Sequence, residues 1–82
     1  MFYVYVLRNP SGRLYIGQTD NLDKRVKRHQ IGGVRWTSAH GPWELAYNET
    51  YSTRSEAMRR ERVLKVGKAN QELHQLLNKE VP

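Results

Sequence analysis

Hydrophobic positions form a continuous block at the start of the chain and later take helical spacing. Residues 2–8 are apolar, aromatic and β-branched, which is typical of a strand. Asn9-Pro10-Ser11-Gly12 then supplies the residues of a type I turn closed by a left-handed glycine, and residues 13–18 form the returning strand. A third strand is expected over residues 43–51.

The turn also determines which side chains of the two strands are neighbours. A turn closed by Asn9 and Arg13 places Tyr5 opposite Gly17. Tyr15 then becomes the diagonal neighbour of Tyr5 on the same face, within reach of its ring. A one-residue slip would separate the two rings. Because glycine has no side chain, we expect room for a ligand at this point.

A polar segment after the hairpin has the features of a helix start. Thr19-Asp20-Asn21 can cap a helix over about residues 21–30, and an aspartate is favourable at that end of the helix dipole. Leu22 and Val26 lie four residues apart and mark the buried stripe of this helix. Residues 31–42 are expected to form a loop.

Two further helices are expected after the third strand. Thr53-Arg54-Ser55-Glu56 is a capping box, which opens a helix that runs to about Val66 and stops at Gly67. The predicted order β-β-α-β-α-α is an α+β fold, a small three-stranded antiparallel sheet flanked by helices. The last helix is indicated by the amphipathic spacing of Leu73, Leu76 and Leu77.

Length and composition narrow the class of protein. Eighty-two residues suit one modest core, so we expect a single domain over residues 1–82. The absence of cysteine excludes a disulfide framework and thiolate metal sites. The longest apolar run, Phe2–Leu7, is far shorter than the ~20 residues of a membrane span, and no basic segment precedes it. We therefore expect a cytoplasmic protein that does not enter a membrane.

Positive charge is in clear excess. Fourteen Lys and Arg against eight Asp and Glu give a net charge of +6 and a pI near 10.0. Such an excess is either an ordinary basic surface or the mark of a polyanionic partner, since each neutralised phosphate releases counterions. The clustering of basic residues at positions 24–28 and 59–60 favours nucleic acid. The expected contacts are Lys24, Lys27 and Arg28.

Glu61 stands at an unusual place in its helix. It falls among the apolar positions Ala57, Met58 and Leu64, where a carboxylate is costly unless it is paired or binds a cation. It either pairs with a neighbouring arginine, reaches solvent at the edge of the stripe, or coordinates a metal.

Four other side chains are candidates for chemistry, although each also has an ordinary explanation. Arg25 and His29 share one face of the first helix, where an arginine is usually solvated and a histidine usually interacts with the helix end. Tyr5 and Tyr15 alone would be common strand aromatics. Together with Glu61 they provide a base for water, a cation for the developing charge and a metal ligand, which phosphodiester hydrolysis requires.

Ordered motifs along nearly the whole chain resemble the GIY-YIG nuclease superfamily. In the first motif only the tyrosine of Gly-Ile-Tyr is retained. Later segments are similar to small stand-alone bacterial members, and the chain also resembles the N-terminal nuclease domain of the excision-repair incision subunit. The matching segments are Phe2-Tyr3-Val4-Tyr5-Val6-Leu7, Leu14-Tyr15-Ile16-Gly17-Gln18-Thr19, the Arg-x-x-x-His helix that ends at His29, Thr37, residues 41–45 and residues 56–65.

The resemblance implies a metal-dependent endonuclease that uses Mg²⁺ or Mn²⁺, with Tyr5, Tyr15, Arg25, His29 and Glu61 as catalytic residues. Glu61 matches the family's metal-binding glutamate. Tyr5 is expected to take a proton from the attacking water, alone or in a relay with His29. The alternative, with His29 as the base and Tyr5 as an orienting group, stays open. Arg25 would contact the phosphate, and Tyr15 would orient the water or the phosphate.

DNA is the expected substrate in preference to RNA, cut non-specifically or by its structure, in DNA repair or processing. Gly17 is expected to contact nucleic acid together with the basic residues of the first helix. A protein partner is a candidate source of specificity, because 82 residues hold no extra recognition domain. Asn70 is the nearest counterpart of a polar residue that many members carry after the metal helix. The competing hypothesis is a catalytically silent nucleic-acid-binding module of the same fold.

Overall fold

The computed structural model describes residues 1–31 and 39–78 of the chain. It confirms the expected α+β fold and the expected order of elements. Most of the loop expected over residues 31–42, Thr37 included, lies outside the described residues. In chain order the elements are β1 (Phe2–Arg8), β2 (Leu14–Thr19), α1 (Leu22–Gln30), β3 (Glu44–Tyr51), α3 (Arg54–Leu64) and α4 (Gly67–Asn78).

The antiparallel sheet has the strand order β2-β1-β3, so the first strand is central and β2 is an edge. Tyr5 pairs with Gly17, as the turn chemistry predicted. The turn closes through the Asn9 amide, which donates to the Arg13 carbonyl at 3.1 Å. Gly12 has a φ of 86°, the left-handed conformation that the bulged turn requires. The predicted hairpin register is therefore confirmed.

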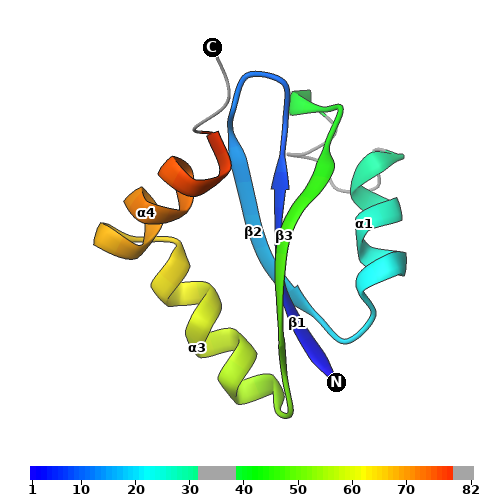
Figure 1. Ribbon diagram of the computed structural model, residues 1–82. Helices are drawn as coiled ribbons and strands as arrows, with labels where there is room; N and C mark the ends of the chain where they lie inside the picture. The colour runs from blue at the N-terminus through cyan, green and yellow to red at the C-terminus, as the bar shows by residue number, and fades with distance from the viewer. Residues whose placement is uncertain (32–38, 79–82) are drawn as a thin grey trace.

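The two faces of the sheet carry different cores because alternate residues of a strand point to opposite sides. Helix α1 covers one face, and α3 and α4 cover the other (Figure 1). Tyr5, Leu7 and Trp43 form the buried cluster on the α1 face. The cluster on the α3 face is wholly aliphatic and consists of Val4, Val6, Ile16, Ala57, Leu64 and Leu73.

Both predicted helix starts are confirmed. The Asn21 side chain accepts a hydrogen bond from the Lys24 amide at 3.1 Å and so caps α1. The Thr53 hydroxyl accepts from the Glu56 amide at 3.2 Å and donates to the Glu56 carboxylate at 2.9 Å, so Thr53 caps α3. These caps satisfy amide donors that have no partner within the helix.

The structure corrects several details of the later elements. Helix α3 ends at Leu64 rather than near Val66, and Gly67, with a φ of 63°, opens α4 instead of following a stop. Strand β3 begins one residue after Trp43, whose side chain is buried. Met58 is 42% exposed, so its expected place on the buried stripe was wrong. The spacing of apolar residues did not show where the buried face of the helix ends and its exposed face begins.

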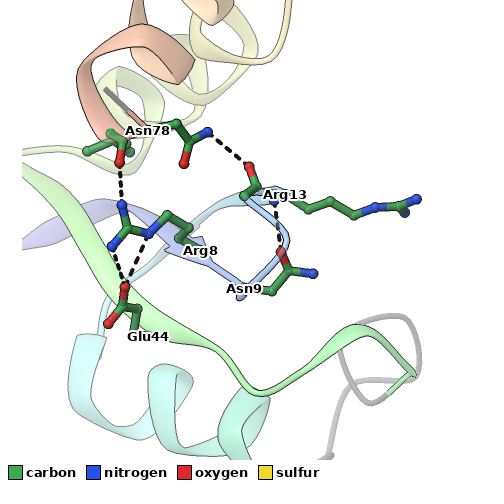
Figure 2. Close-up of polar contacts among 7 residues, drawn as sticks. Arg8, Asn9, Arg13, Glu44 and Asn78 are labelled. Atoms are coloured by element: carbon green, nitrogen blue, oxygen red, sulfur yellow. Dashed lines mark hydrogen bonds and ion pairs between the residues drawn. The ribbon is translucent and has the colours of Figure 1, made fainter. Parts of the chain in front are cut away.

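Polar contacts tie the C-terminal helix to the hairpin (Figure 2). The Arg8 guanidinium donates to the Leu77 carbonyl and to the Glu44 carboxylate, the latter at 2.6 Å. The Asn78 side-chain amide donates to the Gly12 carbonyl at 3.0 Å. Because the last carbonyls of a helix lack partners within it, Arg8 acts as a side-chain cap for α4.

In the described part of the chain, no helix has the length and apolar character needed to cross a membrane.

Candidate functional site

Three rings from three elements gather on the α1 face of the sheet. The hydroxyl of Tyr5, on β1, lies 3.0 Å from Nε2 of His29, in the last turn of α1, and the two groups share a hydrogen bond. Both residues are buried, with exposed fractions of 0% and 2%. The ring of Tyr15, on β2, has its centroid 4.6 Å from that of His29 and 6.3 Å from that of Tyr5. The predicted proximity of the two tyrosines is confirmed.

Gly17 lies directly beneath the Tyr5 ring. A Cβ atom at Gly17 would lie 2.5 Å from the Tyr5 hydroxyl oxygen and 2.6 Å from Cζ, closer than real Cβ atoms come. The space expected for a ligand at this glycine is thus filled by the tyrosine itself, and that expectation was wrong. The glycine allows the buried ring to cross the edge strand. A contact between Gly17 and nucleic acid remains a prediction.

The chemical environment of Tyr5 brings in Arg25 and Glu61. Burial raises the pKa of Tyr5 to about 12, and the negative charge of Glu61 acts in the same direction. Hydrogen bonding and positive charge from Arg25 oppose this increase. The other four residues expected to be catalytic thus each contact Tyr5 or influence its pKa, and its phenol is protonated at neutral pH.

The imidazole of His29 is neutral at pH 7. Burial lowers its pKa below the ordinary 6.5, and the positive charges of Arg25 and Arg28 lower it further. A neutral imidazole has one nitrogen that can accept a proton. In the tautomer that leaves Nε2 unprotonated, the Tyr5 hydroxyl donates to that nitrogen.

Glu61 lies at the edge of the buried flank of α3, with its side chain 21% exposed. Of the alternatives considered for it, an ion pair is present, but the partner is Lys65 rather than an arginine. The Lys65 ammonium donates to Oε2 of Glu61 at 2.9 Å. The sequence analysis did not single out Lys65. The Glu-to-Lys spacing of four residues on a helix would have identified the pair.

A hollow of about 310 Å³ opens beside this pair, between the edge strand and the junction of α3 with α4. Asn70, at this junction, donates to the Leu64 carbonyl at 2.9 Å and so caps the end of α3. Asn70 thus lies next to the site, although its chemical role is still a prediction. The residues lining the hollow are Leu14, Tyr15, Ile16, Lys65 and Asn70.

Basic side chains lie along α1. Lys24, Lys27 and Arg28 are exposed, as nucleic-acid contacts must be, while Arg25 is half-buried. A second hollow, of about 150 Å³, is lined by Thr19, Asp20, Asn21, Lys24, Arg25 and Arg28. Arg25 therefore connects this basic surface to the buried tyrosine.

The donor set limits which metal ion the site suits. Within residues 1–31 and 39–78, no group of three or more His, Cys, Asp or Glu side chains is placed to hold a metal. Glu61 is a single half-buried carboxylate beside the ring cluster. Mg²⁺ is usually held by one or two carboxylates and keeps several waters and phosphate oxygens as its other ligands. Glu61 fits such an ion.

The comparison with known families identifies the class of protein to which this chain belongs. Residues 1–73 match the family described as the GIY-YIG catalytic domain, and the chain belongs to that family. It is 39% identical over 82 residues to a UPF0213 protein of Clostridium perfringens, a match that covers 99% of this chain and 88% of the relative.

Further relatives agree with this membership. A UPF0213 protein of Staphylococcus haemolyticus is 39% identical over 72 residues, which is 87% of this chain and 88% of that protein. The solution NMR structure of a UPF0213 protein from Bacillus halodurans superposes with a TM-score of 0.55 at 34% identity, and covers 98% of this chain and 86% of that one.

Proposed function

We propose that this protein is a metal-dependent DNA endonuclease that hydrolyses phosphodiester bonds. Its family supports a nuclease-type function. The observation that carries the proposal is the convergence on Tyr5, which is hydrogen-bonded to His29 and feels the charges of Arg25 and Glu61. A buried tyrosine needs one hydrogen-bond partner, but not an imidazole, a guanidinium and a carboxylate together. Together they provide the groups that this hydrolysis requires.

In the proposed mechanism, Tyr5 and His29 act as one proton acceptor. A pKa of about 12 means that a free Tyr5 phenolate is scarce at neutral pH. The neutral His29 removes this difficulty, because Tyr5 can pass its own proton to Nε2 as it takes one from the attacking water. The raised tyrosine pKa makes a free phenolate scarce, and the lowered histidine pKa keeps the imidazole neutral, so that Nε2 is available to accept the proton.

Arg25 and Tyr15 face the substrate in this proposal. Both are half-buried, whereas Tyr5 and His29 have almost no exposed surface. The guanidinium of Arg25 can hold two phosphate oxygens, and a move toward the phosphate uncovers the phenol that it contacts in the free protein. Tyr15 orients the water or the phosphate. Glu61 would hold Mg²⁺ or Mn²⁺, which as a Lewis acid supplies charge stabilisation at the scissile phosphate.

The proposed substrate is DNA that is recognised through its backbone. The exposed Lys24, Lys27 and Arg28 and the net charge of +6 support phosphate contacts that carry no sequence information. We therefore propose non-specific or structure-selective cutting in DNA repair or processing in the cytoplasm. A protein partner is the proposed source of any further specificity.

The test is incubation of purified protein with supercoiled plasmid, branched DNA, single-stranded DNA and RNA, in Mg²⁺, Mn²⁺ or EDTA. Cleavage of DNA with either metal and none in EDTA is expected. Glu61→Gln should lower cleavage to background while retaining the fold and DNA binding. Glu72→Gln is the matched control, because it changes an exposed glutamate on α4 that also pairs with a lysine four residues away. Binding without cleavage by the parental protein would instead indicate a silent module.

A further inference from the structure

Among the lysines that the structure describes, Lys65 differs because its ammonium contacts the proposed metal ligand directly. Its ammonium lies 2.9 Å from Glu61, and the two side chains are 48% and 21% exposed. Lys68 and Glu72 on α4 have the same spacing but lie 4.0 Å apart, with side chains 87% and 64% exposed. The first pair is close and partly shielded from water, whereas the second is loose and solvated.

The same lysine also borders a space large enough for another partner. Lys65 lines the 310 Å³ hollow beside Tyr15, and half of its side chain is accessible. Lysine carries its charge on a flexible four-carbon stem, so the ammonium can swing between neighbouring anions at little cost. Lys65 thus contacts the Glu61 carboxylate and also lines the hollow, whereas Glu61 is not among the residues that line it.

Two cations cannot share the same carboxylate oxygen without repulsion. Mg²⁺ has twice the charge of an ammonium and prefers carboxylate oxygens, so its arrival at Glu61 would release Lys65. A released lysine next to Tyr15 would find the phosphate of a bound DNA strand as the nearest negative charge. This step rests on the proposed function, since it needs both a divalent cation and a phosphodiester.

We propose that Lys65 and a divalent cation replace one another at Glu61. In the metal-free protein, Lys65 neutralises the carboxylate. Once a divalent cation is bound there, Lys65 binds a DNA phosphate in the hollow beside Tyr15. Metal binding and DNA binding are thereby coupled through one side chain. Before the metal binds, Lys65 neutralises Glu61, because an unpaired, partly buried charge would cost stability.

The first arm of the test measures Mg²⁺ binding to the free protein by NMR titration, without DNA. Lys65→Met should bind Mg²⁺ roughly two- to five-fold more tightly, the size expected for loss of a partly exposed competing ion pair. Lys68→Met, the matched control, should bind as the parental protein does. Lys65→Arg keeps the charge and should also bind like the parent. Unchanged or weaker Mg²⁺ binding by Lys65→Met, or no binding of Mg²⁺ by the parent, would overturn the proposal.

The second arm measures affinity for a phosphorothioate duplex that resists cleavage, over a range of salt concentrations at fixed Mg²⁺. Loss of one phosphate contact should reduce the log–log salt slope of Lys65→Met by about 0.9 relative to the parent. Lys68→Met and Lys65→Arg should keep the parental slope. A parental salt slope in Lys65→Met would show that Lys65 does not bind a DNA phosphate. Amide NMR spectra of each variant verify the fold.

The two proposals fail in different ways. If the parental protein cuts DNA with Mg²⁺ and Lys65→Met shows parental metal affinity and salt slope, the endonuclease stands and the exchange is wrong. If the parental protein binds Mg²⁺ and DNA but does not cut, the endonuclease is wrong while both arms still measure the exchange.

Discussion

The two faces of the sheet are built from alternate residues of the same central strand, yet they serve different purposes. Val4 and Val6 point toward α3 and α4 into an aliphatic core. Tyr5 and Leu7, their immediate neighbours, point toward α1. On that side Tyr5, Trp43 and His29 are buried side chains that carry polar atoms, and the Tyr5 hydroxyl shares a hydrogen bond with His29. One face is an aliphatic core, and the other holds the groups that the proposed hydrolysis would use.

Two carboxylates near α3, those of Glu49 and Glu61, also differ in the number of partners that they contact. The carboxylate of Glu49, on β3, accepts two hydrogen bonds from the Arg60 guanidinium, at 2.9 and 3.1 Å. It also accepts hydrogen bonds from the hydroxyls of Tyr47 and Tyr51. Burial alone would raise the pKa of Glu49, but these donors lower it overall. In the described part of the chain, the ion-pair partner of Glu61 is Lys65, whose side chain is 48% exposed. A carboxylate with every position filled is structural, whereas one with a displaceable partner is suited to binding a cation.

The largest expected effect is the loss of cleavage when the Tyr5 hydroxyl, on the α1 face of the sheet, is removed. Tyr5→Phe keeps the ring and removes the hydroxyl, so single-turnover cleavage should fall by the ~10²–10⁴ typical of losing a general base. The free energy of unfolding should change by only about 1 kcal/mol, the size of one hydrogen bond. Parental cleavage by Tyr5→Phe together with an inactive His29→Ala would assign the base to the histidine alone.

Gly17→Ala should reduce cleavage by about 10², because a displaced catalytic group loses most of its effect. The new methyl group would overlap the Tyr5 hydroxyl and push the ring away from His29. Gln18→Ala, on the neighbouring residue and the opposite face, is the control and should cut normally. Single-turnover rates and a melting curve are needed for both. Full activity in Gly17→Ala would show that the ring does not need the bare glycine.

Val6→Ala should have the opposite signature to Tyr5→Phe. Val6 has no exposed surface, and loss of two buried carbons with the resulting cavity should cost roughly 1–3 kcal/mol of unfolding free energy. Cleavage measured well below the melting temperature should be unchanged. Urea denaturation and rates on one substrate give both quantities. A large loss of rate at full folding would mean that the aliphatic face also shapes the site.

The smallest effect is a pH dependence of stability from His29. Burial lowers its pKa below 6.5 in the folded protein. As the pH falls below 6.5, the imidazole therefore binds a proton more readily in the unfolded chain than in the folded one. This contribution is present above pH 6.5 and is lost as pH falls toward the folded-state pKa. Urea denaturation at about pH 7.5 and about pH 5.5 should show the loss, with a smaller difference in His29→Gln. Equal differences in both proteins would contradict the assignment.

Much of the site was predictable because it depends on local geometry. Turn residues determined the hairpin register, and so the meeting of Tyr5 with Tyr15. Helical periodicity placed Arg25 and His29 on one face. The local pattern failed where exposure depends on what packs above a residue, as for Met58. It also missed Lys65, whose importance follows from what Glu61 contacts.

By itself, then, the sequence determined the elements, the hairpin register, the excess of positive charge and the family to which the motifs belong. Each of these follows from neighbours along the chain, through backbone geometry and side-chain periodicity. Only the tertiary structure decided that β1 is central, that Tyr5 fills the space above Gly17, and that Glu61 acts on Tyr5 from another element. Those facts depend on the packing of helices against a sheet, where distances and burial between remote residues set both contacts and proton affinities.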